Sequence, residues 1–335
     1  MNPDIPDTFQ ALVVNKTDTS FSVNTQALTL EDLPIGEVVI QVAYSSVNYK
    51  DGLASIPDGN IVKSYPFVPG IDLSGYVVSS SDKRFTKGQP VIATGYDIGV
   101  SHFGGFSQYV RIPAKWIIPL PEGLTLKEAM ILGTAGFTAA LSIQSLELNG
   151  ISPEQGKVLV TGATGGVGGA AIAMLAKNGY HVDASTGNAN AAHYLKALGA
   201  KEILSREDVL GQSDKPLNKQ LWQAAVDSVG GATLAAILSK LAYRGAVAAS
   251  GLTGGASLPT TVLPFILRGV SLMGIDSVFC DGDTRTKVWN RMATDLKPNN
   301  LDTLIDREVT LRELPEALKD ILQSRTLGRI LVALN

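Results

Sequence analysis

Two hydrophobic patterns divide the chain. Short runs with alternating apolar and polar positions, such as Val38–Val47, occupy the region from Phe9 to Ile112 and are separated by turn residues. An alternation with a period of two is typical of half-buried strands, so this region predicts an antiparallel β domain. Beyond Pro119–Gly123 the period lengthens to about 3.6, as in the helical pattern of Leu126–Ile143. We therefore place a domain boundary between residues 125 and 126.

The second region predicts a strand, a tight turn, a helix and another strand in direct succession. Apolar residues Val158–Thr161 lead into the glycine-rich stretch Gly162–Gly169, which is followed by the helix formers Ala170–Lys177 and a β-type run at Tyr180–Ser185. Further helices and strands alternate as far as Ile275 and include a helix expected near 218–223 and six strands in total. This order predicts a doubly wound parallel sheet, so the fold class is α/β.

The glycine-rich turn matches a dinucleotide-binding fingerprint in which alanine replaces the first glycine. Gly165 would let backbone N–H groups approach a pyrophosphate, and Gly168 would let the helix pack on the strand. Such turns also occur as plain loops, but the flanking strand, helix and second strand favour nucleotide binding. The candidate contacts in the turn and at the following strand ends are Ala163, Thr164, Gly165, Gly166, Val167, Gly168, Ser185, Thr186, Gly187, Asn188, Ser228, Val229, Gly251 and Leu252.

The end of the second strand of this unit indicates which cofactor is preferred. NAD-specific folds place a carboxylate there, which would repel the 2′-phosphate of NADPH. Here the tip reads Ser185–Asn188, and Arg206 follows nearby, so hydroxyl donors and a cation favour NADPH. Asp183 is the rival signal for NAD. It lies mid-strand, and we interpret it as structural.

Composition and charge narrow the class of protein. The chain has 335 residues, 45% hydrophobic and 18% charged, with a net charge of −3, which argues against nucleic acid or an anionic membrane as the main partner. The single cysteine, Cys280, excludes an internal disulfide. Residues Met1–Asp7 have neither the basic region nor the apolar core of a signal peptide, so we expect a cytoplasmic protein.

Two polar segments of the β region have two interpretations each. One is Ser45–Asp51, where a strand ends in polar side chains that could act on a ligand or form a solvated loop. The other is Gly95–Gly105, which contains Tyr96, Asp97 and His102. It could line a pocket or serve as an inert connection between strands.

The motifs together resemble the medium-chain dehydrogenase/reductase superfamily, in its zinc-free, quinone-oxidoreductase-like branch, and most closely NADPH-dependent acryloyl-CoA reductases. The segments that carry the resemblance are Ser46–Gly52, Pro69–Asp72, Gly133–Ala139, Thr161–Gly168 and Leu258–Arg268. It implies a GroES-like domain of residues 1–125 completed by 300–335, a Rossmann domain of residues 126–299, and a homodimer. It also implies additional cofactor contacts at Tyr49, Thr138, Asp276, Ser277 and Arg329. Close relatives often carry Arg or Lys at the position of Asn188.

The same resemblance bears on the chemistry. Ile71-Asp72 stands where zinc-dependent relatives have His-Glu, and the 48–51 region has no cysteine, so we expect no metal site. Without a Lewis acid, hydride addition to an activated C=C bond is favoured over alcohol oxidation.

Three functions are compatible with these motifs: an acryloyl-CoA reductase, a quinone or general enone reductase, and an NADPH-binding protein without turnover. The candidate catalytic residues are Asn48, Tyr49, Lys50 and Asp51. Tyr49 would either donate a proton or pack on the cofactor, and Lys50 and Asp51 would orient it or the substrate.

Overall fold

The computed structural model describes residues 5–211 and 215–334. The chain divides into two compact units. The first unit comprises residues 1–134, 278–290 and 305–335, and the second comprises 135–277 and 291–304. These limits differ from the expected division at 125 and 299, since helices α2 (Leu126–Leu148) and α8 (Gly282–Ala293) each contribute to both units.

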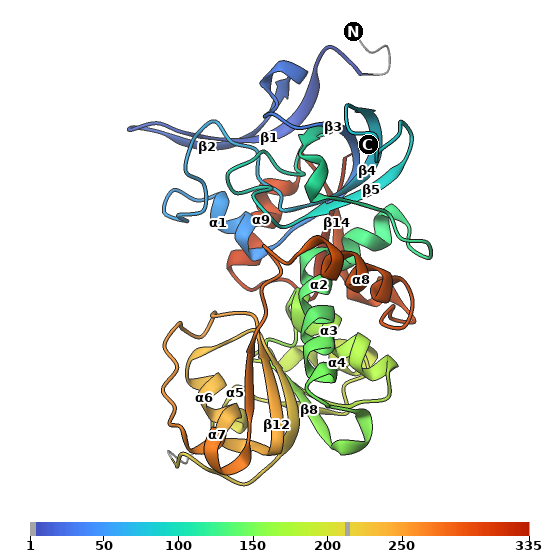
Figure 1. Cartoon of the computed structure of the whole chain (residues 1–335). Coiled ribbons are helices and arrows are strands. Elements are labelled where there is room, and N and C mark those ends of the chain that lie inside the picture. Colours follow the sequence, from blue (N-terminus) through green and yellow to red (C-terminus); the bar gives the residue numbers. More distant parts are fainter. Residues whose placement is uncertain (1–4, 212–214, 335) are drawn as a thin grey trace. The chain divides into compact units, whose positions relative to one another are not determined.

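In the described residues, the first unit contains a two-stranded hairpin, β1–β2, and a seven-stranded sheet in the order β14-β15-β3-β4-β5-β7, with β6 paired to β3 (Figure 1). Every pairing is antiparallel except that of β14 with β15. Its strands are β1 Phe9–Lys16, β2 Phe21–Leu28, β3 Val38–Ser46, β4 Asp72–Ser80, β5 Pro90–Thr94, β6 Tyr109–Ile112, β7 Ile117–Pro119, β14 Ile305–Thr310 and β15 Arg329–Ala333. Two further helices are α1 Tyr49–Ala54 and α9 Leu314–Leu322.

The core of the first unit follows from the alternation seen in the sequence. Val38, Ile40 and Val42 on β3 are buried, and so are Ile330 and Val332 on β15, and they belong to one hydrophobic cluster. Ser46 lies opposite Leu331 in the ladder between these two strands. Because a central strand needs partners on both edges, the C-terminal strand completes the sheet that the N-terminal strands begin.

The second unit contains, among the described residues, a six-stranded parallel sheet in the order β10-β9-β8-β11-β12-β13. The chain reverses its direction of travel along the sheet between β8 and β11. Helices α3 and α4 lie on one side of the strands, and α5 and α6 lie on the other (Figure 1). This is the predicted doubly wound fold. Its elements are β8 Lys157–Val160, α3 Gly166–Lys177, β9 His181–Ser185, α4 Ala192–Ala197, β10 Glu202–Leu204, α5 Arg206–Leu210, β11 Trp222–Asp227, α6 Gly231–Lys240, β12 Leu241–Ala249, α7 Leu263–Arg268 and β13 Ser271–Gly274.

The helix expected near 218–223 is wrong. The segment before Trp222 is irregular, and Trp222 already begins β11, which pairs with both β8 and β12. A helix does form earlier, at Arg206–Leu210, where Ser205 accepts a hydrogen bond from the N–H of Asp208 and so caps the first turn.

Helix α2 is longer than the predicted Leu126–Ile143 and is bent. Gly133 has φ 53° and ψ −156°, a conformation that ends one helical segment and starts another. By length and composition, α2 is the one helix in the described part of the chain that could cross a membrane, but 83% of its most apolar window is buried inside the protein. A mostly buried apolar helix is typical of a protein core.

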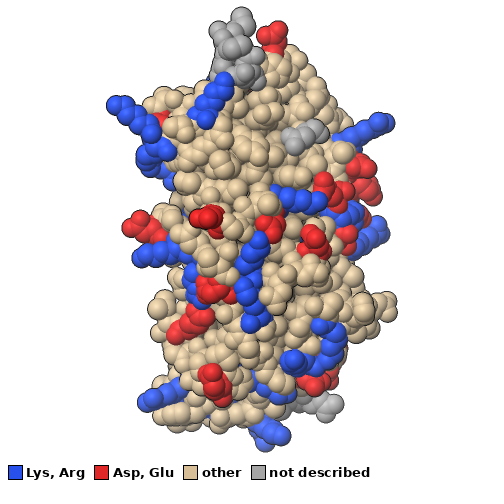
Figure 2. Space-filling model, turned by 90° about the vertical axis from the view of Figure 1, so that its right-hand side faces the viewer, with Lys and Arg blue, Asp and Glu red and all other residues tan. Residues whose placement is uncertain are grey.

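Charged side chains are distributed without a large patch of one sign on the face shown in Figure 2. Lys and Arg alternate there with Asp and Glu, and apolar or neutral residues cover the space between them. This face offers no basic surface for a polyanion.

Candidate functional site

The glycine-rich turn joins β8 to α3 and is shaped by two close approaches. Gly162 has φ 58°, which glycine adopts without strain, and a Cβ there would lie 2.3 Å from Ser228 Oγ. A Cβ on Gly168 would lie 2.4 Å from the carbonyl oxygen of Gly162, so its absence lets the helix pack on the turn. Ala163 is buried and its φ is not positive, so alanine is tolerated at this position.

The N-terminus of α3 faces the open side of this turn. Gly165 is its N-cap and is exposed, while Gly166 and Val167 are half-buried. The first N–H groups of a helix have no partner within the helix, and they carry a partial positive charge. Together with Thr164, which is half-buried, this turn is suited to holding a pyrophosphate.

The tip of β9 brings the predicted phosphate ligands together. Ser185 and Thr186 are buried, and the Thr186 hydroxyl accepts a hydrogen bond from the N–H of Asn188 at 3.0 Å. The guanidinium of Arg206 lies over Gly187, since a Cβ there would be 2.7 Å from both Cζ and Nε of Arg206. Asn188 is exposed beside them. The Thr186 hydroxyl and the Arg206 cation therefore lie at this strand end, while the Ser185 hydroxyl donates to the carbonyl oxygen of Ser205 at 3.4 Å.

Asp183 does not reach the strand tip. Its carboxylate is buried, accepts a hydrogen bond from Trp222 Nε1 at 3.0 Å and lies 3.5 Å from Lys157 Nζ. These partners support the structural interpretation of Asp183, because both contact its Oδ2 from other strands of the sheet, while Oδ1 lies 3.4 Å from His181 Nε2 on the same strand.

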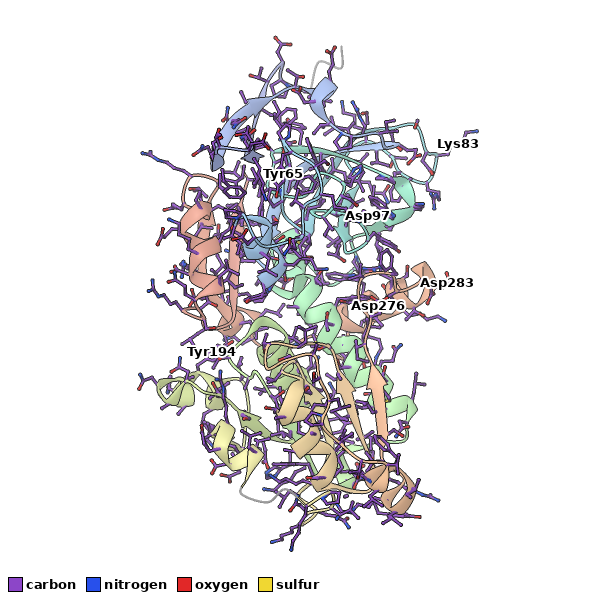
Figure 3. The ribbon with its side chains drawn as sticks, turned by 90° about the vertical axis from the view of Figure 1, so that its left-hand side faces the viewer. Tyr65, Lys83, Asp97, Tyr194, Asp276 and Asp283 are labelled. Atoms are coloured by element: carbon purple, nitrogen blue, oxygen red, sulfur yellow. The ribbon has the colours of Figure 1, made fainter. Side chains whose placement is uncertain are left out.

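The loops after β11 and β12 lie at the same carboxyl edge of the sheet. Ser228 Oγ donates to the carbonyl oxygen of Thr161 at 3.1 Å, which links the loop after β11 to the glycine-rich turn. An open hollow of about 470 Å³ is lined by residues that follow β12 and β13, among them Gly251, Leu252 and Asp276, the last of which is labelled in Figure 3. The predicted contacts Ser228, Val229, Gly251, Leu252, Asp276 and Ser277 thus all follow strands of one sheet edge.

The sequence analysis missed Asp227. This buried carboxylate accepts hydrogen bonds from Thr161 Oγ1 at 2.5 Å and from the N–H of Gly230 at 2.8 Å, and burial raises its pKa. It fixes the loop that carries Ser228 and Val229. The signal in the sequence was a carboxylate at the end of a strand, directly before Ser-Val-Gly-Gly.

The polar segment of the first unit is not a loop but the start of helix α1. Asn48 is the N-cap, and the Asp51 carboxylate accepts hydrogen bonds from the N–H of Asn48 at 2.8 Å and of Ile71 at 3.0 Å. Asp51 is fully buried. Burial, and to a lesser extent the negative charge of Asp72, raises its pKa to about 7.

The four candidate catalytic residues have different surroundings. Asn48 is buried, and its Nδ2 donates to Asp72 at 2.7 Å. Asp51 is engaged with backbone N–H groups, as described. Tyr49 is 49% exposed at the first position of the helix, and Lys50 is half-buried. Of these residues, only Tyr49 and Lys50 therefore present part of their side chains to solvent.

Two predicted cofactor contacts, Arg329 and Thr138, are buried and bonded to other parts of the protein. Arg329 is buried, and its guanidinium donates to Asn48 Oδ1, to Ser46 Oγ and to the carbonyl oxygens of Ile131 and Val47. Thr138 is buried in α2, where its carbonyl oxygen accepts from Ser142 Oγ. Their contacts with a nucleotide stay predictions.

The loop at Gly95–Gly105 is held by contacts of its side chains with residues outside the loop and by one hydrogen bond within it. The Tyr96 ring stacks on Trp116 with centroids 5.7 Å apart, and the Arg285 guanidinium lies 4.5 Å from the centre of the Tyr96 ring. His102 bonds to the carbonyl oxygen of Arg111 at 2.7 Å. Asp97, labelled in Figure 3, accepts from Ser101 Oγ. These contacts favour a structural connection over a pocket wall, and the sequence analysis missed the parts played by Trp116 and Arg285.

Residues 5–211 and 215–334 contain no cluster of at least three His, Cys, Asp or Glu side chains arranged to hold a metal ion. The expectation that activity needs no metal stays a prediction.

The two architectures and the glycine-rich turn define a class. Residues 34–122 match the family model of the alcohol dehydrogenase GroES-like domain, and residues 166–294 match that of the zinc-binding dehydrogenases. The chain belongs to the medium-chain dehydrogenase/reductase family, with a GroES-like domain and a Rossmann-type domain, as the sequence analysis expected. It is an NAD(P)-dependent oxidoreductase of this family.

Its relatives cover nearly the whole chain. The Bacillus subtilis protein YhfP, named as a quinone oxidoreductase, is 60% identical over 97% of this chain and 99% of its own length. Its crystal structure with NAD bound superposes with a TM-score of 0.96, covering 98% of this chain and 100% of that one. The acrylyl-CoA reductase AcuI of Ruegeria pomeroyi is 48% identical over 98% of this chain and 99% of its own. The yhdH oxidoreductase of Salmonella enterica, solved in complex with NADP, is 44% identical with a TM-score of 0.94, covering 97% and 100%.

Proposed function

We propose that the protein reduces the activated C=C bond of an α,β-unsaturated thioester with NADPH, and that acryloyl-CoA, giving propanoyl-CoA, is the substrate it uses best. The substrate class is supported by the identity of 48% to an acrylyl-CoA reductase over 98% of the chain. The family motif without His-Glu at positions 71 and 72 supports chemistry on a C=C bond without a metal.

The preference for NADPH is supported by the tip of β9, the single observation that carries the proposal. Thr186 and the guanidinium of Arg206 over Gly187 offer uncharged and charged donors to a 2′-phosphate, and Asp183 is turned away into contacts with Trp222 and Lys157. A relative with NADP bound and another with NAD bound are both similar to this chain, so the fold accepts either cofactor and local side chains set the preference.

The reaction needs a group that stabilises negative charge on the thioester oxygen. NADPH supplies a hydride to the β-carbon of the substrate. The charge that then develops on the oxygen is stabilised by a hydrogen-bond donor, and a proton must reach the α-carbon. The Tyr49 hydroxyl is the donor we assign, because its side chain is half-exposed while Asn48 and Asp51 are engaged in internal hydrogen bonds.

A second candidate, quinone or general enone reduction, is supported by the identity of 60% to YhfP. A protein that binds NADPH without turnover is the third. A screen of NADPH oxidation against acryloyl-CoA, crotonyl-CoA and simple quinones, each with and without a chelator, separates the three. Oxidation that is fastest with acryloyl-CoA and insensitive to the chelator is expected. Faster oxidation with quinones, or none with any substrate while NADPH still binds, contradicts the proposal.

We also propose a homodimer formed through the second unit. Strand β13 ends the sheet order, and within the described residues no further strand pairs with it. Leu272 on β13 is 37% exposed, and Ile266 and Leu267 on helix α7, which precedes β13, are 68% and 58% exposed. An exposed edge strand beside apolar side chains is a template for pairing, and antiparallel pairing of β13 with the same strand of a second copy gives a closed twofold assembly.

A further inference from the structure

A buried carboxylate, Asp72, gathers hydrogen bonds from separate segments of the first unit. It is fully buried at the start of β4. Ser46 Oγ, at the end of β3, donates to it at 2.8 Å, and Nδ2 of Asn48, the N-cap of α1, donates at 2.7 Å. The backbone N–H of Thr134 donates at 3.0 Å to both of its oxygens, and the Thr134 hydroxyl also donates.

Arg329 encloses this carboxylate from the C-terminal strand. Its Nη2 lies 3.6 Å from Asp72 Oδ2 and donates to Ser46 Oγ at 2.7 Å, while Nη1 donates to Asn48 Oδ1 at 3.2 Å. Asn48 is therefore held at both ends of its amide, with Nδ2 on Asp72 and Oδ1 on Arg329. A buried ion pair with additional hydrogen bonds has one defined geometry.

Gly133 leaves the room in which these groups meet. A Cβ there would lie 2.5 Å from Asp72 Oδ2 and 2.8 Å from both Ser46 Oγ and Arg329 Nη2. The bend of α2 at this residue also directs the N–H of Thr134 at the carboxylate. The absence of a side chain at Gly133, the bend of α2 and the hydrogen bonds from Thr134 therefore all contribute to one polar cluster around Asp72.

We propose that Asp72 is a positioning residue for the segment of candidate catalytic residues, Asn48–Asp51. Its carboxylate fixes Asn48 and, through this N-cap residue, the first turn of α1 and the side chain of Tyr49. As far as turnover is concerned, the inference rests on the proposed function. The positioning of Asn48 and Tyr49 by Asp72 does not depend on the proposed function, because the hydrogen bonds from Asn48 to Asp72 and from Arg329 to Asn48 exist without a substrate.

The cluster carries an electrostatic signature that a purely structural role lacks. Asp51 faces the N–H groups of Asn48 and Ile71, and the charge that acts on it is that of Asp72 on β4, which itself pairs with Arg329 on β15. Helix α9 meets α1 at Gly52 with Ile321 and Leu322, which are uncharged. The negative charge of Asp72 contributes to the raised pKa of Asp51, so removing it lowers that pKa.

The test compares Asp72→Asn, which keeps the shape but not the charge, with the milder Ser46→Ala and with Asp183→Asn. The last is a matched control, a buried carboxylate of the second unit that bonds to Trp222. For Asp72→Asn we expect kcat to fall by about ten- to a hundredfold, the size expected when a reacting group is displaced by up to about 1 Å. The KM for NADPH should stay unchanged.

The pH profile and the tyrosine itself supply two further readouts. In the wild type, activity should decline below about pH 7 as Asp51 takes up a proton and releases its N–H partners. In Asp72→Asn this decline should move to lower pH, and in Asp183→Asn it should stay in place. With 3-fluorotyrosine in all nine tyrosines, the ¹⁹F signal assigned by Tyr49→Phe should shift or broaden in Asp72→Asn and Ser46→Ala.

The outcomes separate the two claims. An unchanged Tyr49 signal in both Asp72→Asn and Ser46→Ala overturns the positioning role, whatever the activity. A lower kcat accompanied by an equal change in Asp183→Asn, with no shift of the pH profile, also overturns it. If the wild type oxidises NADPH with none of the substrates, the proposed function fails, but the ¹⁹F comparison still decides the role of Asp72.

Discussion

Tyr49 and Asp51 lie two positions apart on the first turn of α1, yet their side chains have opposite surroundings. Successive residues of a helix are rotated by about 100°, so positions i and i+2 point in nearly opposite directions. Asp51 is therefore buried against Asn48 and Ile71, while Tyr49 is half-exposed. At the scale of single residues, the structure separates a capping carboxylate from a hydroxyl that can meet a substrate.

Replacing Tyr49 by Phe removes the hydroxyl and keeps the ring. If Tyr49 donates to the thioester oxygen, kcat for acryloyl-CoA falls by about 10- to 1000-fold, because one lost donor costs up to about 4 kcal/mol in the transition state. Tyr76→Phe is a matched control, since Tyr76 on β4 is 48% exposed against 49% for Tyr49. Steady-state kinetics and the Kd for NADPH are the measurements. A near-native kcat with weaker NADPH binding would identify Tyr49 as a cofactor contact.

Thr186→Asp places a carboxylate at the tip of β9. In the wild type we expect kcat/KM to be about ten- to a hundredfold higher for NADPH than for NADH, since a charge-assisted hydrogen bond contributes roughly 1.5 to 3 kcal/mol. In the variant this ratio should fall towards one, because the new carboxylate repels the 2′-phosphate. Thr286→Asp, on the exposed side of α8, adds the same charge in the first unit and should leave the ratio unchanged. Equal use of both cofactors by the wild type would refute the preference.

The raised pKa of Asp51 predicts how the stability of the folded protein changes with pH. Its folded pKa of about 7 lies above its ordinary value of 3.8, so between these pH values the folded state binds more protons than the unfolded state. Stability from this group is then full below about pH 4 and is lost as the pH rises through 7. The melting temperature of the wild type minus that of Asp51→Asn should decrease across this interval. A constant difference would show that Asp51 does not titrate there.

Single elements are shaped by contacts beyond their own sequence, and α2 is the clearest case. Its helical pattern alone predicts a straight helix, but Gly133 bends it with a positive φ. The bend brings Thr134 to Asp72 on β4. Strand β11 is a second case, because its pairing with β8 and β12 takes Trp222 into a sheet where the local pattern favours helix.

Gly133→Ala tests the bend. The variant meets both an unfavourable φ and the close oxygens and nitrogen of the Asp72 cluster, so we expect a loss of about 2 to 4 kcal/mol in the free energy of unfolding. Gly88→Ala is the control, because Gly88 has φ 83° but a Cβ on it would meet no atom within 4 Å, and it should cost about 1 kcal/mol. Urea titration measures both values. Equal losses would mean that the cluster adapts to the extra methyl group.

For the whole molecule, the proposed assembly through β13 explains why a strand at a sheet edge carries apolar side chains. Monomeric proteins usually protect such edges with charges or prolines. Here Leu272 lies on the edge strand, with Ile266 and Leu267 exposed on α7, which precedes it.

Leu272→Asp is expected to shift the protein from dimer to monomer, because two carboxylates would face each other across the twofold axis. Leu148→Asp is the control, since Leu148 at the end of α2 is 82% exposed and lies away from β13 in the sequence and outside the sheet. Sedimentation velocity distinguishes the species. A wild-type monomer, or a dimer retained by Leu272→Asp, would contradict the proposed interface.

Local periodicity was sufficient for most of the fold. The unit from β8 through α3 to β9, the six parallel strands and the antiparallel β domain all follow from patterns that span a few residues. Positive φ angles and close packing demand glycine at defined places, so the turn at Gly162–Gly168 was also visible. The convergence of Thr186, Gly187 and Arg206 was predicted because strand ends of a parallel sheet share one edge.

Only the tertiary structure decided which polar side chains face solvent, where they can contact a ligand, and which are engaged in internal hydrogen bonds. The pairing of Arg329 with Asp72 and Asn48, and the contact of Arg285 with Tyr96, join residues far apart in the chain. No local pattern specifies such pairs, because each depends on which strands become neighbours. The sequence by itself determined the two architectures and the candidate residues, while burial and long-range hydrogen bonds divided those residues into ones that hold the site and ones that face solvent.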